Sequence, residues 1–142
     1  MTALVIDEDP EVTFYPSNKD TGEPDTGQVF DRVRLLDNGY CHGLLTQGYE
    51  QKFYPPREIV EVIQSDPDEA PIPDDEYRID HGAEIWFTGD REPMPSDEVA
   101  LLPGAWLAAR RYESGAIYFP AHRIDTVHTH TSDEQEAAGW FR

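Results

Sequence analysis

The feature that most constrains the fold of this chain is a pattern that occurs twice along it. The first copy covers residues 33–64 and the second covers residues 99–130. Each copy begins V-x-L-L, passes through a glycine turn that an aromatic residue follows, and then reaches a second glycine turn. Each ends with two aromatic residues and P-x-x-x-I-x-x-V. Because the small gaps between the copies fall in turns, the pattern predicts an internal duplication, with chance agreement between short β-rich segments as the alternative.

The local sequence of both copies is typical of short antiparallel strands. Asn38 and Gly39 stand between apolar runs, which predicts a hairpin with a type I′ turn. Residues 113–115 (ESG) supply a three-residue hairpin loop with glycine last. Residues 55–56 and Pro120 end a strand in each copy, because proline has no N–H to donate to a β-ladder. The spacing from proline to isoleucine then fits one tight turn before a final strand.

These signals predict an all-β protein made of two similar small barrels or meander units, with less than about 15% helix. Residues 11–14 (EVTF) and 84–87 (EIWF) add a further matched strand to each unit. The predicted boundaries are residues 1–64 for the first unit with its acidic N-terminal segment, 65–80 for an acidic proline-rich linker, 81–131 for the second unit, and 132–142 for a short tail. A capping box from Ser132 to Gln135 makes a short helix possible in that tail.

One segment of the second copy resembles a known fold. Residues 105–127 (AWLAARRYESGAIYFPAHRIDTV) are similar to the C-terminal half of an SH3 domain, which has a W-W-L-A segment, a distal hairpin and a G-x-x-P-x-x-Y-V pattern. Residues 39–63 fit the same template more loosely. The resemblance implies two SH3-like small barrels in tandem.

The positions that form the peptide-binding groove of SH3 domains differ here. Pro120 stands at the place of the groove proline, but Ala105 replaces the groove tryptophan. Arg123 in the second copy and Glu58 in the first replace the groove tyrosine, whereas Trp106 matches the neighbouring tryptophan, which packs on the sheet. The resemblance therefore implies the fold and not the recognition of proline-rich peptides.

The charge of the chain predicts the medium in which it works. There are 29 Asp and Glu against 11 Lys and Arg, for a net charge of −18, and only Lys19 and Lys52 are lysines. This balance resembles that of proteins from salt-accumulating halophilic archaea, where molar salt screens the repulsion between carboxylates. We therefore expect K⁺ and other salt cations to stabilise the protein. An acidic, partly disordered interaction protein is the alternative, but three Trp, seven Tyr and six Phe argue against it.

Several functional classes have no support in the sequence. Its apolar runs are too short for a transmembrane helix, and its first ten residues lack the basic and apolar regions of a secretory signal. We therefore expect a cytoplasmic protein with no membrane partner. Cys41 is the sole cysteine, which excludes an internal disulfide, and we expect it to be buried and inert. Nucleophile-elbow, Walker and dinucleotide motifs are absent, so we expect neither an enzyme nor a cofactor.

Three histidines near the C-terminus are weak candidates for a metal site. His128 and His130 would share one face of a strand, and His122 is close in sequence. Imidazoles in this arrangement ligate zinc or copper when a further ligand completes the site. The alternative, which we prefer, is surface histidines that bind no metal.

The second copy carries the candidate binding residues. Residues 99–132 hold two acidic and three basic residues, while the flanking segments are acidic. Interface cores hold few charges and are rich in Trp, Tyr and Arg. The candidate binding residues are Trp106, Arg110, Arg111, Tyr112, Tyr118 and Arg123.

These residues predict a non-catalytic interaction module, which binds a protein partner or associates with its own copy. A nucleic-acid-binding small barrel, which would stack bases on the aromatic rings, is the first alternative. A histidine-based metal-binding protein is the second. A third alternative is that the arginines have only a structural role. The predicted core includes Ile59, Val62, Trp106, Ile124 and Val127, because the last strand of each unit must close its barrel.

Overall fold

The computed structural model describes residues 2–15, 27–73, 77–89, 91–111 and 114–129. Of these residues, 56% lie in β-strands, which confirms the prediction of an all-β protein. Helix is confined, in the described ranges, to single 3₁₀ turns at Pro56–Glu58 (η1), Pro67–Glu69 (η2) and Ala121–Arg123 (η3). The helix expected within residues 132–142 lies outside the described residues.

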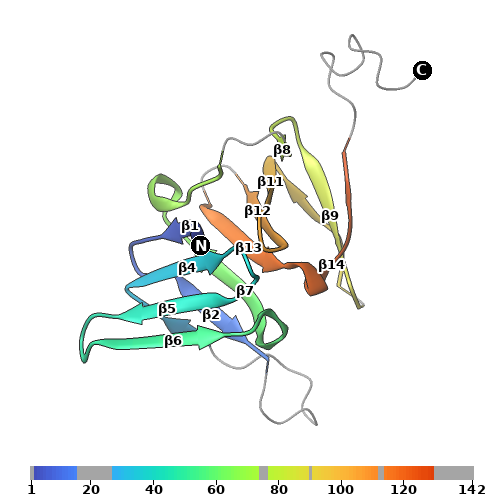
Figure 1. Cartoon of the computed structure of the whole chain (residues 1–142). Coiled ribbons are helices and arrows are strands. Elements are labelled where there is room, and N and C mark those ends of the chain that lie inside the picture. Colours follow the sequence, from blue (N-terminus) through green and yellow to red (C-terminus); the bar gives the residue numbers. More distant parts are fainter. Residues whose placement is uncertain (1, 16–26, 74–76, 90, 112–113, 130–142) are drawn as a thin grey trace.

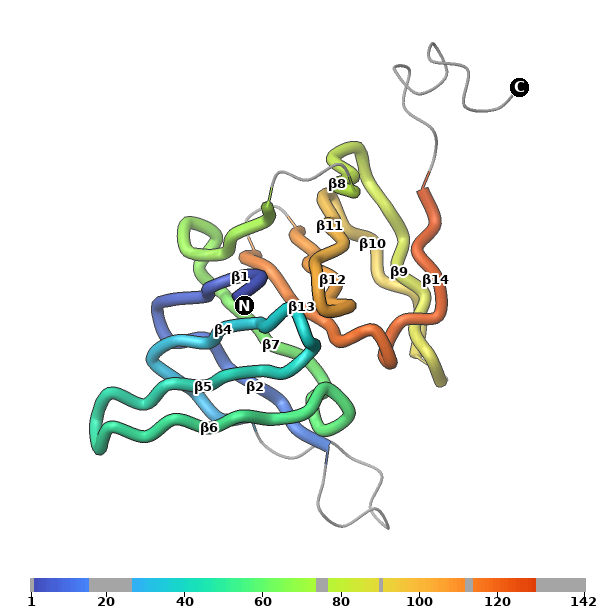
Figure 2. Tube along the Cα trace, viewed as in Figure 1, coloured from blue at the N-terminus to red at the C-terminus, as the bar shows by residue number. Residues whose placement is uncertain are grey.

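The strands form three antiparallel sheets (Figures 1 and 2). Sheet A has the order β1-β4-β5-β6, with strands Thr2–Ile6, Arg32–Leu36, Cys41–Leu45 and Glu50–Tyr54. Sheet B has the order β3-β2-β7-β13-β12-β11-β8, with strands Gln28–Val29, Glu11–Phe14, Ile59–Gln64, Ala116–Pro120, Trp106–Arg110, Glu98–Leu102 and Arg78–Ile79. Sheet C has the order β10-β9-β14, with strands Met94–Ser96, Ala83–Phe87 and Ile124–His128.

The strand pairing of the first half of the chain recurs in the second half. We call β1 to β7 the first unit and β8 to β14 the second unit. The order β1-β4-β5-β6 of the first unit corresponds to β8-β11-β12-β13 of the second, and β3-β2-β7 corresponds to β10-β9-β14. One further pairing, between β7 and β13, places Val62 opposite Tyr118 and Ile63 opposite Ile117. Sheet B is therefore three strands of the first unit joined edge to edge with four strands of the second.

The two units do not have separate cores. On β11 to β13, alternate side chains point to opposite faces of the sheet. Val99, Leu107 and Phe119 pack with residues of β9 in a core that belongs to the second unit. The side chains of the other face, among them Trp106 and Tyr118, complete the core of the first unit. This three-strand meander is thus buried on both faces, which explains its nearly uninterrupted apolar sequence.

The turns largely follow the sequence signals, with one correction. Strand β6 ends at Tyr54, before the proline pair, and a 3₁₀ turn precedes the last strand of each unit, as expected. The hairpin at residues 38–39 forms, but the type I′ prediction is wrong, because Gly39 has φ +92° while Asn38 does not have a positive φ. The amide of Gly39 instead donates to the carbonyl of Leu36 (3.0 Å), so that a single left-handed residue closes the loop.

Part of the segment expected to be a solvated linker is packed against the rest of the protein. Ala70 is almost fully buried in the core of the first unit, and Ile72 packs against the same core. Residues 78–79 form β8, which pairs with β11. The proline-rich composition concealed this packing, because short apolar residues between prolines and acids carry no periodic signal.

The predicted core is only partly confirmed. Ile59, Val62 and Trp106 are fully buried or nearly so. Ile124 and Val127, which are the counterparts of Ile59 and Val62 in the second unit, are only partly buried. The reason lies in the sheets: β7 is paired on both sides, whereas β14 is the last strand of sheet C.

Candidate functional site

The two described aromatic candidates of the second copy point into the protein. The indole of Trp106 is 1% exposed, and its Nε1–H donates to the carbonyl of Gly39 at 3.1 Å. The hydroxyl of Tyr118 donates to the carbonyl of Pro71 at 2.8 Å. Both rings therefore hold the second unit against the first unit and the linker. Stacking of nucleic-acid bases needs exposed rings, which these positions do not offer.

Two of the candidate arginines are also directed at the junction between the units. Arg110 donates to the carbonyl of Ala70, and its guanidinium lies 3.8 Å from the carboxylate of Glu98. Arg123 is largely buried and donates through Nη1 to the carbonyl of Val60 at 2.9 Å. Arginine is suited to such positions, because its fixed donors satisfy several backbone carbonyls while its stem packs on apolar surface.

The remaining candidates fall elsewhere. Arg111 is exposed at the end of β12, and Tyr112 lies outside the described residues. Among the histidines, Nε2 of His122 lies 2.7 Å from the carbonyl oxygen of Pro56, and Nε2 of His128 lies 2.8 Å from the hydroxyl of Thr126. His130 lies outside the described residues. In the ranges that the structure covers, no three His, Cys, Asp or Glu side chains are grouped so that they could hold a metal ion.

A different surface, the outer face of sheet A, exposes aromatic side chains. One row of paired residues crosses this face from β1 to β6 and consists of Val5, Arg34, His42 and Phe53, of which Val5 and Phe53 are exposed, Arg34 is half-buried and His42 is buried. The imidazole of His42 stacks on the ring of Phe53, with centroids 4.3 Å apart and an interplanar angle of 5°. Phe53 remains 58% exposed, and Tyr40, in the neighbouring turn, is 41% exposed.

The alignment of the two copies contains a signal for this face. When the two copies are aligned, Phe53 is the counterpart of Tyr118, and Tyr40 is the counterpart of Trp106. We selected the aromatic residues of the second copy because fewer acids surround them. In the structure these are the buried members of each pair, and the exposed members belong to the first copy.

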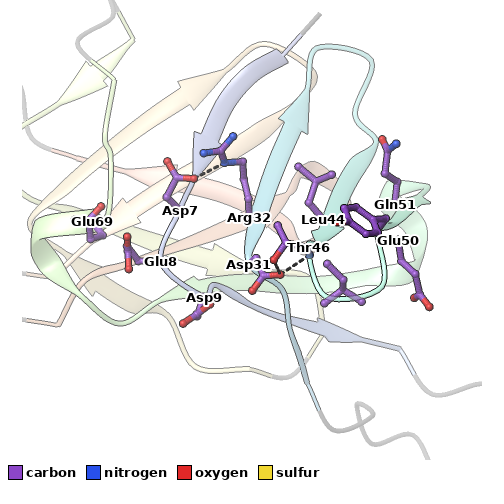
Figure 3. Close-up of a pocket in the computed structure, with 12 residues that line it drawn as sticks. Asp7, Glu8, Asp9, Asp31, Arg32, Leu44, Thr46, Glu50, Gln51 and Glu69 are labelled. Carbon is purple, nitrogen blue, oxygen red and sulfur yellow. Dashed lines mark hydrogen bonds and ion pairs between the residues drawn. The ribbon is translucent and has the colours of Figure 1, made fainter.

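An acidic cleft of about 690 Å³ lies at one end of sheet A. Six carboxylates and one guanidinium, that of Arg32, line it; the carboxylates belong to Asp7, Glu8, Asp9, Asp31, Glu50 and Glu69. Figure 3 shows Asp7, Glu8 and Glu69 on one side of the cleft and Glu50 and Gln51 on the other. Tyr49, which is almost fully exposed, also lines it.

Hydrogen bonds fix part of the cleft wall. Oδ2 of Asp31 accepts from the amide (2.6 Å) and the hydroxyl (2.8 Å) of Thr46, and these two bonds lower the pKa of the Asp31 carboxyl. Asp7 forms an ion pair with Arg32. The amide side chain of Gln64 donates to the carbonyls of Asp7 and Glu8, which holds the loop before β2 in place. A wall of ionised carboxylates attracts cations and basic side chains, and Asp31 is unsuited to donate a proton near neutral pH.

Cys41 is buried in the first core, as expected. Burial raises the pKa of its thiol to about 12. The thiolate is the reactive form of cysteine, so the side chain is an apolar core residue here.

Comparison with known proteins finds no counterpart: no protein-family profile, curated protein or solved structure matches the chain. Within the described ranges, no helical segment has the length and apolarity needed to cross a membrane.

Proposed function

We propose that this protein is a non-catalytic interaction module, which binds protein through the outer face of sheet A. Tyr40 and Phe53 would provide the apolar contacts and Arg34 the polar ones. The acidic cleft beside them would take basic side chains of the partner. Aromatic residues and arginine contribute most of the affinity in protein interfaces, particularly where polar residues surround them.

One observation carries this proposal. The equivalent face of the second unit, with Trp106 and Tyr118, is already covered by protein inside the chain. The same architectural face is exposed in the first unit, where Tyr40 and Phe53 occupy the equivalent positions. Large exposed aromatic side chains on a sheet favour an interface, because exposed apolar surface without a role is a liability for solubility.

The proposal extends to the origin of the fold and to its medium. We infer two SH3-like units related by duplication, and the recurrence of strand pairing supports this inference. We also infer a halophilic protein that works in the molar KCl of a salt-accumulating cytoplasm, and the net charge of −18 supports it. At such salt concentrations an interface must depend on apolar contact more than on long-range attraction between charges.

Capture of partners by a tagged chain tests the proposed function. The wild type, a Y40S/F53S double variant and the control Val29→Ser are incubated in about 2 M KCl with a lysate of the cells that make the protein, with and without nuclease treatment. Val29 is the matched control, because it is an exposed aliphatic residue on β3, in a different sheet.

We expect the wild type and V29S to retain the same proteins, which can include untagged copies of the chain, and the double variant to lose them. If all three retain the same proteins, the outer face of sheet A is not the binding surface. If the retained material disappears on nuclease treatment alone, the binding is to nucleic acid and the proposal is wrong.

A further inference from the structure

Three apolar residues of the second unit are less buried than their counterparts in the first unit. Leu101 is 49% exposed while Leu35 is fully buried. Ile124 and Val127 are partly buried, while Ile59 and Val62 are fully buried. Leu35, Ile59 and Val62 share one core with the side chains on the outer face of β11 to β13, among them Trp106 and Tyr118. In the part of the chain that the structure describes, nothing covers the core of the second unit in the same way.

On the outer faces of the two meanders, the aromatic residues of the second unit are the more buried ones. Tyr118 and Trp106 are buried against the first unit, whereas their counterparts Phe53 and Tyr40 are exposed. The described residues therefore leave two surfaces without a partner surface inside the chain. We call the outer face of sheet A the head surface, and the side of the second unit that includes Leu101 and β14 the tail surface.

The sheet edges also differ between the internal junction and the head and tail surfaces. In sheet B the row Arg78, Ala100, Ala108, Tyr118 continues across the junction to Val62. The equivalent row on sheet A, from Val5 to Phe53, stops at β6, which is the last strand of its sheet. Strand β14, the counterpart of β7, is likewise the last strand of sheet C. Within the described residues, both strands that correspond to the internal junction thus keep one unpaired edge.

We propose that copies of this chain associate head to tail, with β6 of one copy pairing antiparallel with β14 of the next. The internal junction supplies the register, since Tyr118 opposite Val62 translates to Phe53 opposite Val127 of the neighbouring copy. The head surface then covers Leu101, Ile124 and Val127, as the second meander covers their counterparts inside the chain. Such a contact joins two different surfaces, so it generates rings or open chains and not a closed symmetric pair. This inference rests on the proposed function and names a second copy as the partner.

Complementation between two blocked variants of the purified full chain tests the assembly. Phe53→Asp places a charge in the head surface, Val127→Asp places one in the tail surface, and Val29→Asp adds the same charge on β3, away from both. Molar mass is measured by light scattering over a range of protein concentrations in about 2 M KCl, where repulsion between the acidic copies is screened. Circular dichroism and cooperative unfolding establish that each variant folds.

We expect the mass of the wild type and of V29D to rise with concentration, while F53D alone and V127D alone stay monomeric. A mixture of F53D and V127D regains association but stops at a heterodimer, because each variant keeps one competent surface. If the wild type stays monomeric, this inference is wrong. The proposed function is then still decided separately, by whether partner capture depends on the outer face of sheet A. If F53D loses association and V127D does not, the contact is symmetric through β6 and the head-to-tail proposal is wrong. The proposal is also wrong if F53D and V127D are folded but do not associate when mixed.

Discussion

Trp106 shows how one residue connects the two units. Its ring fills the first core, and its indole N–H satisfies the carbonyl of the Gly39 turn. Trp106→Phe removes both the hydrogen bond and part of the buried volume, so we expect a loss of about 2–4 kcal/mol in unfolding free energy. Trp86→Phe is the matched control, because Trp86 is 39% exposed, and it should cost about 0.5 kcal/mol or less. Urea unfolding in molar KCl measures both; equal losses would contradict the junction role of Trp106.

Cys41 gives a pH dependence whose sign follows from its burial. The thiol has a pKa of about 12 when folded, above the value of about 8.5 for an unfolded cysteine. Its contribution to stability is therefore complete below about pH 8.5 and is lost as the pH rises toward 12, at up to about 1.4 kcal/mol per pH unit.

A comparison with Cys41→Ala isolates this group. The variant leaves a small cavity and is less stable than the wild type near pH 8. As the pH is raised to about 10, the wild type loses stability that the variant does not, so the difference should shrink by about 2 kcal/mol. A difference that is constant with pH would show that the thiol is accessible to water in the folded state.

The β12–β13 hairpin gives the sharpest test at the level of elements. Gly115 has φ +78°, and a Cβ there would overlap the carbonyl oxygen of Gln64 at the end of β7. Gly48, in the corresponding hairpin of the first unit, has φ +95°, with no atom within 4 Å of the position of a Cβ. Both alanine variants carry the left-handed strain of about 1–2 kcal/mol, but only Gly115→Ala also separates the two units. We expect G115A to cost at least about 2 kcal/mol more than G48A in denaturant unfolding; equal costs would mean that the junction adjusts without loss.

The strands of the two meanders could be predicted from the sequence, whereas the pairing between the two units could not. Glycine and proline punctuation and apolar runs identify each meander, because these signals act within a few residues. The β7–β13 pairing joins segments more than 50 residues apart, and it follows from packing. The short β8 inside the acidic segment was missed for the same reason, since only its pairing with β11 makes it a strand.

At the scale of the whole molecule, the sequence predicted two similar units but not which copy exposes its aromatic residues. The two copies have comparable patterns, and the burial of Trp106 and the exposure of Tyr40 depend on their order in the chain. The second meander is covered by the first unit, and the first meander has no unit before it within the described residues. A pattern of residue types therefore identifies the aromatic positions of each unit, while the tertiary arrangement decides which of these side chains are buried.

The net charge of −18 leads to the last prediction, which concerns salt. Repulsion between carboxylates opposes the compact state, and it acts over about 10 Å at 0.1 M salt but only about 3 Å at 1 M. The melting temperature should therefore rise steeply between about 0.1 M and 2 M KCl. The cleft provides a local test, because Glu50 and Glu69 are exposed carboxylates in a wall with five further charged residues.

Glu69→Gln should raise the melting temperature by about 1–3 °C at low salt, and by much less at high salt. Glu50→Gln should raise it by less than Glu69→Gln does, because Nζ of Lys52 lies 4.0 Å from the Glu50 carboxylate and that attraction is also lost. Arg57→Gln, which removes an exposed positive charge, should lower it at low salt. Differential scanning calorimetry of the three variants measures these shifts. If the melting temperature of the wild type is flat or falls with KCl, the acidic surface is not an adaptation to salt. If E50Q, E69Q and R57Q shift it in the same direction, local packing and not charge is responsible.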